Sequence, residues 1–184
     1  MRQDTTNQNK VTEALNRVVN QAVENDGRTE AYLCSLRLPR EFNEDPHQAN
    51  QIYKKVQADF CKHVMRSTGR TPRYVAVKTE NGDNPEYAFC LFTKTDATLD
   101  KPEEYAEKGR EIANGKAGQA GWGRGKLDIV ELFKDAPRFT IASQSIKVTE
   151  HNREDAILQL HQHLQNRRDI EALHQRTIFV SKCS

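Results

Sequence analysis

The chain has 184 residues, of which 36% are hydrophobic and 29% charged, and its formal net charge is +2. This length suits one domain with its own core, and the near balance of charges excludes a protein that binds polyanions with its whole surface. The sequence has no apolar run long enough to span a bilayer and no signal-peptide pattern, so a cytoplasmic protein without a membrane partner is expected. The four cysteines form no CxxC pair, as expected in a reducing compartment.

The N-terminal part predicts a tail, a helix and a strand. Residues 1–10 are polar and predict a disordered tail. Apolar residues at helical spacing then predict a helix over 11–25, which Gly27 ends. The segment AYLCSLRLP, residues 31–39, alternates between two faces and predicts a strand that stops at its proline.

The clearest helix signal covers residues 46–69. Asp45 can cap the first turn, Pro46 suits the first helical position, and Gly69 can end the helix. Apolar residues recur along one side of this segment, so one face of the helix is expected to lie in the core.

A hairpin is predicted in the middle of the chain. Strands over 73–79 and 86–94 flank the dipeptide Asn81-Gly82, which is typical of tight hairpin turns. A helix is expected to begin near Lys101, and a glycine-rich loop is expected over 115–126.

The remaining segments predict a short strand over 127–133, a long helix over 154–174 and a last strand over 176–182. The order of elements predicts an α+β fold of the ferredoxin-like, split βαβ type: an antiparallel sheet with helices on one face and helical additions at both ends. The predicted organisation is a disordered tail over 1–10 and a single domain over 11–184, with its core in 28–133 and a C-terminal helix and strand in 151–184.

Charge is segregated along the chain. Acidic residues dominate 80–107, whereas basic residues dominate the helix 46–69 and the strand after it. A basic face favours a nucleic-acid partner, although solvated helix faces produce similar runs. In the glycine-rich loop the backbone could approach a phosphate and the tryptophan could stack on a base, or the loop is simply a mobile surface segment. The residues predicted to contact nucleic acid are Lys54, Lys55, Lys62, Arg66, Arg70, Arg73 and Lys78, with Trp122, Arg124 and Lys126 from the loop.

The hairpin strands carry a family resemblance. PRYVAVKT, residues 72–79, and NPEYAFCLF, residues 84–92, resemble two strands of the YagK/YfjJ C-terminal family, the inovirus-type replication proteins of filamentous phages, prophages and satellite elements. The segments AYLCSLRLP, FTIASQSIKVTE and RTIFVSK are similar to further segments of this family in the same order. The resemblance covers about residues 28–182 and implies an HUH-endonuclease-like protein.

In HUH endonucleases two histidines on alternate positions of one strand hold a divalent metal, and a tyrosine attacks the scissile phosphate. By this resemblance Glu86 and Ala88 occupy the histidine positions and Gln144 the tyrosine position, while Lys147 is retained. These four residues are therefore interpreted as a degenerate former active site. No catalytic residue, metal ligand or cofactor is expected.

The His-x-His pattern formed by His161 and His163 does not replace the missing ligands. It lies in a helical segment, where residues two apart point to different sides, so it is interpreted as part of a solvated helix.

Three functions remain open from the sequence. The first is a degenerate replication initiator that binds single- or double-stranded DNA, at an origin or a promoter, without nicking it. The second is a phage or satellite effector that inhibits a host or rival protein, with the acidic segment 80–107 as its binding surface. The third is an active nicking endonuclease with displaced ligands.

Overall fold

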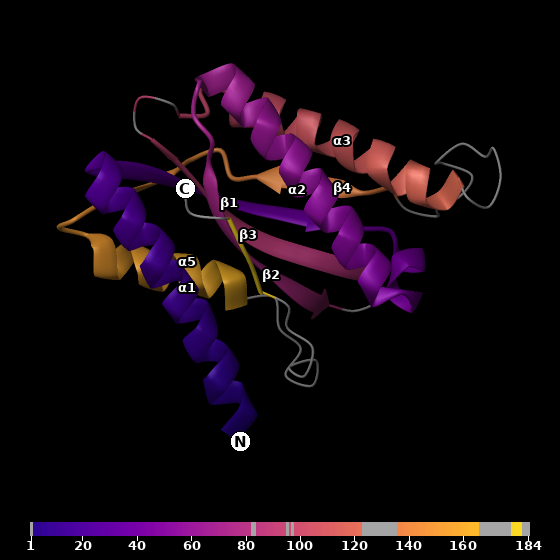
Figure 1. Ribbon diagram of the computed structural model, residues 1–184, viewed down its shortest axis with the longest axis horizontal. Helices are drawn as coiled ribbons and strands as arrows, with labels where there is room; N and C mark the ends of the chain where they lie inside the picture. The colour runs from indigo at the N-terminus through magenta and orange to yellow at the C-terminus, as the bar shows by residue number, and fades with distance from the viewer. Residues whose placement is uncertain are drawn as a thin grey trace.

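The computed structural model describes residues 2–81, 84–94, 96, 98–122, 136–165 and 178–181. In these residues the chain forms an α+β fold with four α-helices, one short 3-10 helix and an open six-stranded sheet (Figure 1). The predicted strand 127–133 lies outside the described residues. No helix in the described part is long and apolar enough to cross a membrane.

The sheet has the strand order β4-β1-β3-β2-β6, and β5 pairs with β1 beyond the end of β4. Every described pairing is antiparallel. The predicted hairpin is confirmed, since β2 and β3 pair from Arg73 opposite Phe92 to Asn81 opposite Asn84. The strands are β1 (Arg28–Arg37), β2 (Arg73–Asn81), β3 (Asn84–Lys94), β4 (Arg138–Ile141), β5 (Ile146–Thr149) and β6 (Ile178–Val180).

Helices α2 (Pro46–Thr68) and α3 (Pro102–Trp122) cover one face of the sheet (Figure 1). The predicted start of α2 is confirmed, because the Asp45 side chain accepts a hydrogen bond from the Gln48 amide at 3.1 Å. Gly69 ends the helix in the left-handed conformation, with φ of 78°. The apolar side of α2 is buried against the aromatic residues of β3 and β4.

Helix α3 runs through most of the predicted glycine-rich loop, so the loop prediction is wrong for residues 115–122. The reason lies in packing. Ala113 and Ala117 are fully buried on one side of α3, and Gly109 lies directly against the ring of Phe139 on β4. Small residues at helical spacing let α3 approach the sheet closely, and this burial outweighs the low helix propensity of glycine.

Helices α1 (Arg2–Asp26) and α5 (Arg153–Gln165) cover the opposite face (Figure 1). Their buried residues, such as Leu15, Val18 and Leu160, form a second hydrophobic cluster with Cys90 and Phe92 of β3. The prediction of helices on one face thus applies to α2 and α3, while the terminal additions cover the other. Helix α1 already begins at Arg2, within the stretch predicted to be a disordered tail.

One edge of the sheet is interrupted by a bulge. Ile141 at the end of β4 pairs with Cys34, whereas Ile146 at the start of β5 pairs with Ala31. Four residues, 142–145, therefore face two residues on β1. Such a bulge bends the edge strand and breaks its regular row of exposed backbone groups.

Candidate nucleic-acid interface

The exposed side of α2 carries a basic stripe. Lys55, Lys62 and Arg66 are seven and four residues apart and are all exposed, so they lie along one line of the helix surface. Eleven residues separate the first from the last, which corresponds to about 16 Å along the helix axis. We call these three residues the α2 stripe.

Two further predicted contacts lie at the sides of the stripe. Lys54 is exposed on α2, and its Nζ lies 5.6 Å from the centroid of the Phe179 ring on β6, in a cation–π contact. Arg70 is exposed directly after Gly69, the residue that ends the helix. The structure thus brings five of the ten predicted basic and aromatic contacts onto or next to one helix.

An acidic residue connects the stripe to α3. The Asp59 carboxylate lies 3.5 Å from Lys62 Nζ and 3.0 Å from Lys116 Nζ. The hydrogen bond from Lys116, helped by the charges of both lysines, lowers the pKa of Asp59. Sequence analysis missed Lys116 and Asp59 as neighbours because the contact crosses between two helices. The Asp59 carboxylate thus holds the ammonium groups of Lys62 and Lys116 close together at the surface.

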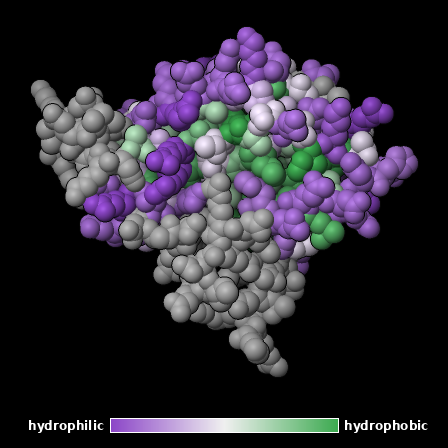
Figure 2. All heavy atoms as spheres, turned by 180° about the vertical axis from the view of Figure 1, so that it is seen from behind, coloured by the Kyte–Doolittle hydropathy of each residue, from purple (hydrophilic) through white to green (hydrophobic). Residues whose placement is uncertain are grey.

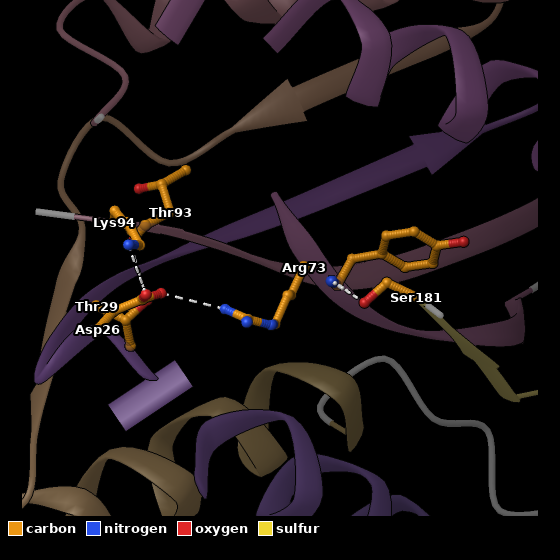
Figure 3. A network of polar contacts seen from close by, with 7 residues as sticks. Asp26, Thr29, Arg73, Thr93, Lys94 and Ser181 are labelled. Carbon is orange, nitrogen blue, oxygen red and sulfur yellow. Dashed lines mark hydrogen bonds and ion pairs between the residues drawn. The ribbon is translucent and has the colours of Figure 1, made fainter. Parts of the chain in front are cut away.

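Arg73 and Lys78 are not on this surface. Arg73 points to the α1 side of the sheet, where its Nη1 lies 3.2 Å from Asp26 Oδ2 (Figure 3). Lys78 is only 4% exposed, on β2. Arg37, Lys78 and Lys94 do not share one open face of the sheet, because the alternation of β2 places Lys78 with Ala76 on the α2 side, whereas Lys94 is paired with Asp26 of α1.

The three contacts predicted in the loop lie outside the part of the chain whose side chains the structure describes. Trp122 is the last residue of α3, and its side chain is outside the description, as are Arg124 and Lys126.

Two residues of the predicted former active site lie on β3. Ala88 is buried on the α1 and α5 side of the sheet, and the alternation of the strand places Glu86 on the same side. Glu86 is 8% exposed and lies directly opposite Arg37 of β1.

The other two residues lie elsewhere. Gln144 is exposed in the bulge, and Lys147 is exposed on β5 opposite Glu30 of β1. Seven residues separate Glu30 from Arg37, the partner of Glu86, which corresponds to about 24 Å along the strand. The structure does not bring Lys147 and Glu86 together.

Sequence analysis also misjudged His163, which packs on the sheet. Its ring Nε2 lies 2.9 Å from the Cys34 carbonyl oxygen of β1, next to the residue that faces Ala88. Burial lowers the pKa of His163, while bonds to the Cys34 and Phe89 carbonyls oppose this effect. A signal existed, because the neighbours Leu160 and Leu164 define a buried side of α5 that includes His163.

Within the described residues, no group of three histidine, cysteine, aspartate or glutamate side chains is arranged to hold a metal ion. The three described cysteines are buried. Burial raises the pKa of all three thiols, that of Cys61 to about 11, so none is an activated nucleophile.

Comparisons with protein-family models, with curated proteins and with solved structures found no match.

Proposed function

We propose that the protein binds DNA through the α2 stripe and does not nick it. In this proposal it is a catalytically degenerate, replication-initiator-like protein of a phage, prophage or satellite element, and it acts in the cytoplasm at an origin or a promoter.

The observation that carries the proposal is the α2 stripe itself. Its three cations span about 16 Å, and the phosphates of one DNA strand recur about every 3.4 Å along the duplex axis, so several phosphates fall within reach. The opposite side of the helix is fixed in the core by residues such as Tyr53 and Phe60. A rigid helix that presents charges costs less ordering entropy on binding than a loop does.

The fold supports a relationship to replication initiators. Strand β3 lies between β1 and β2, and α2 connects these two strands, an order that supports the proposed split βαβ arrangement. With β4 beside β1 and α3 before it, the segment from β1 to β4 is proposed to be ferredoxin-like. A shared fold does not establish a shared function, so the binding surface must carry the functional argument.

The absence of nicking is proposed from the residues that the resemblance assigns. Alanine at position 88 cannot bind a metal, and the glutamine at position 144 has no nucleophilic hydroxyl. A metal-dependent nicking activity that Glu86→Gln abolishes would contradict this part of the proposal.

The test is fluorescence anisotropy with single- and double-stranded DNA at several salt concentrations. The variant Lys55→Gln/Lys62→Gln/Arg66→Gln should weaken duplex binding at least about tenfold and reduce the slope of log K against log salt by about 2.7, or 0.9 for each lost phosphate contact. A matched control is a second triple variant that removes three exposed cations from the other side of the molecule: Lys10→Gln, Arg17→Gln and Arg28→Gln.

Equal losses in both triple variants would indicate a general charge effect and would contradict a site on α2. Absence of binding by the wild-type protein at low salt would reject the proposal as a whole.

A protein partner is the second candidate. Seen from behind, hydrophobic residues show through the middle of the surface, with hydrophilic residues around them (Figure 2). In the described part of the chain Leu158 on α5 is a large hydrophobic side chain that is 63% exposed. Asp96, Asp100 and the exposed glutamates of the first turns of α3 would add a negative surface for the proposed effector. Capture of a defined host or rival protein that Leu158→Glu abolishes would favour this candidate.

A further inference from the structure

Two arginines face each other across the β1–β4 ladder. Arg37 of β1 pairs in register with Arg138 of β4. The Ala142 amide donates to the Leu33 carbonyl at 2.9 Å, and hydrogen-bonded pairs alternate along an antiparallel ladder, so the arginine pair is also a hydrogen-bonded pair. Its Cα atoms are therefore about 5.5 Å apart. Like charges directly opposite each other destabilise a sheet, which calls for a compensating anion.

The charges of the arginine pair are not neutralised by close ion pairs. Among the residues that the structure describes, no carboxylate forms an ion pair with either guanidinium. Arg37 Nη2 instead donates to Asn84 Oδ1 at 2.7 Å, and Asn84 Nδ2 donates to the Leu38 carbonyl at 2.9 Å. A neutral amide thus orients the guanidinium and leaves its charge in place. Glu86, on the other side of Arg37, offsets one of the two positive charges.

Hydroxyl groups occupy the neighbouring pair of the same ladder. Ser35 Oγ and Thr140 Oγ1 are 2.6 Å apart. Because strand residues alternate between faces, these hydroxyls lie on the same side as Arg37 and Arg138, the side away from Phe139 and the α3 layer. Thr140 and Arg138 are exposed. Guanidinium forks beside hydroxyl donors are the groups that bind phosphate oxygens.

We propose that Arg37, Arg138 and Thr140 form a seat for one phosphodiester of a nucleic-acid strand. This inference rests on the proposed DNA-binding function. It adds a second contact with the nucleic acid, on the face of the sheet opposite to the α2 stripe. The seat lies where β1 ends, and the chain continues from there through the short helix Arg40–Glu44 into α2. A strand bound at this end of the sheet is thereby near the start of the helix that carries the stripe.

The experiment is an amide-resolved NMR titration of the full chain with two probes, inorganic phosphate and a thymidine dinucleotide that carries a single phosphodiester. Both probes should shift the amides of Ser35, Arg138 and Thr140 in a saturable way. Arg138→Gln should raise the dissociation constant of the dinucleotide about tenfold. Arg28→Gln, which removes an exposed arginine at the other end of β1, should leave it unchanged.

Thermal unfolding separates binding from folding. Since Arg138 repels Arg37, Arg138→Gln should not lower the melting temperature, whereas loss of a purely structural residue would lower it. The seat is refuted if neither probe shifts these amides, or if Arg138→Gln binds like the wild type. Binding of phosphate without the dinucleotide would assign the seat to a free phosphate and overturn the nucleic-acid part.

The seat and the α2 stripe fail separately. The triple variant of the α2 stripe should keep the titration at Ser35 and Thr140, because its substitutions lie in another layer. If the triple variant loses duplex binding and Arg138→Gln leaves every DNA affinity unchanged, only the seat is rejected. If Arg138→Gln weakens dinucleotide binding and the triple variant binds duplex like the wild type, only the α2 stripe is rejected.

Discussion

Asp26 Oδ1 lies 2.8 Å from Lys94 Nζ, a contact that joins the last residue of α1 to the last residue of β3 (Figure 3). The second carboxylate oxygen lies 3.2 Å from Arg73 Nη1 at the start of β2. A negative charge at the C-terminus of a helix opposes the helix dipole, so Asp26 depends on these two cations. Its side chain is only 7% exposed, which makes the cluster a structural connection between α1 and the sheet.

Asp26→Asn should lower the free energy of unfolding by about 1–3 kcal/mol, because it leaves Arg73 and Lys94 without their anion at a largely buried position. Urea unfolding followed by circular dichroism measures this loss. Glu24→Gln, at an exposed position of the same helix, should change stability by less than about 0.5 kcal/mol. An equal effect of the two substitutions would argue against the cluster.

Gly109→Ala should destabilise the protein, since a Cβ at this position would overlap the ring of the buried Phe139. The expected loss is about 1–3 kcal/mol, larger than the gain of up to about 1 kcal/mol in helix propensity. Gly115→Ala is the matched control on α3, because a Cβ there meets nothing within 4 Å. It should stabilise the protein by about 0.5–1 kcal/mol. Thermal melts of both variants with opposite shifts would support this account of α3.

Helix α2 could be predicted from the sequence and the full length of α3 could not, and the difference lies in where the signals for each helix come from. Helix α2 begins with a cap, a proline and an apolar periodicity, and ends at a glycine, so local signals agree. In α3 the glycines suggested a loop, and the opposing signal, small residues every three or four positions, has meaning only against the Phe139 ring. Tertiary packing overrode local propensity there.

The candidate interface shows the same limit. Exposed lysines and arginines on α2 followed from helical periodicity alone. The positions of Arg73 and Lys78 could not be predicted in this way. The side chains of a strand point to both faces of the sheet, and whether a cation is exposed depends on what covers its face. Asp26, the partner of Arg73, is distant in sequence. The Arg37–Arg138 pair likewise required the register of β1 and β4.

Stability should fall below about pH 6.5, the ordinary pKa of histidine, because burial lowers the folded-state pKa of His163. Since the unfolded chain then binds more protons than the folded one, the contribution is fully present above this pH and is lost as the pH falls through the lowered value. His63 contributes in the same direction, mainly through burial. Urea unfolding between about pH 7.5 and about pH 5.5 should show a flatter profile for His163→Gln than for the wild type. Parallel profiles would contradict this prediction.

Asp59→Asn should strengthen DNA binding, since it releases Lys62 and Lys116 from the carboxylate that they share at 3.5 and 3.0 Å. If both ammonium groups then contact phosphates, the affinity should rise severalfold and the salt slope should steepen by up to about 1.8, or 0.9 per contact. Glu104→Gln removes an exposed carboxylate of α3 that pairs with Lys101, the residue before this helix, and it controls for the change in net charge. Anisotropy titrations of the two variants measure the difference. A weaker complex with Asp59→Asn would mean that the carboxylate holds the lysines in place for binding, and equal gains in both variants would remove Asp59 from the interface.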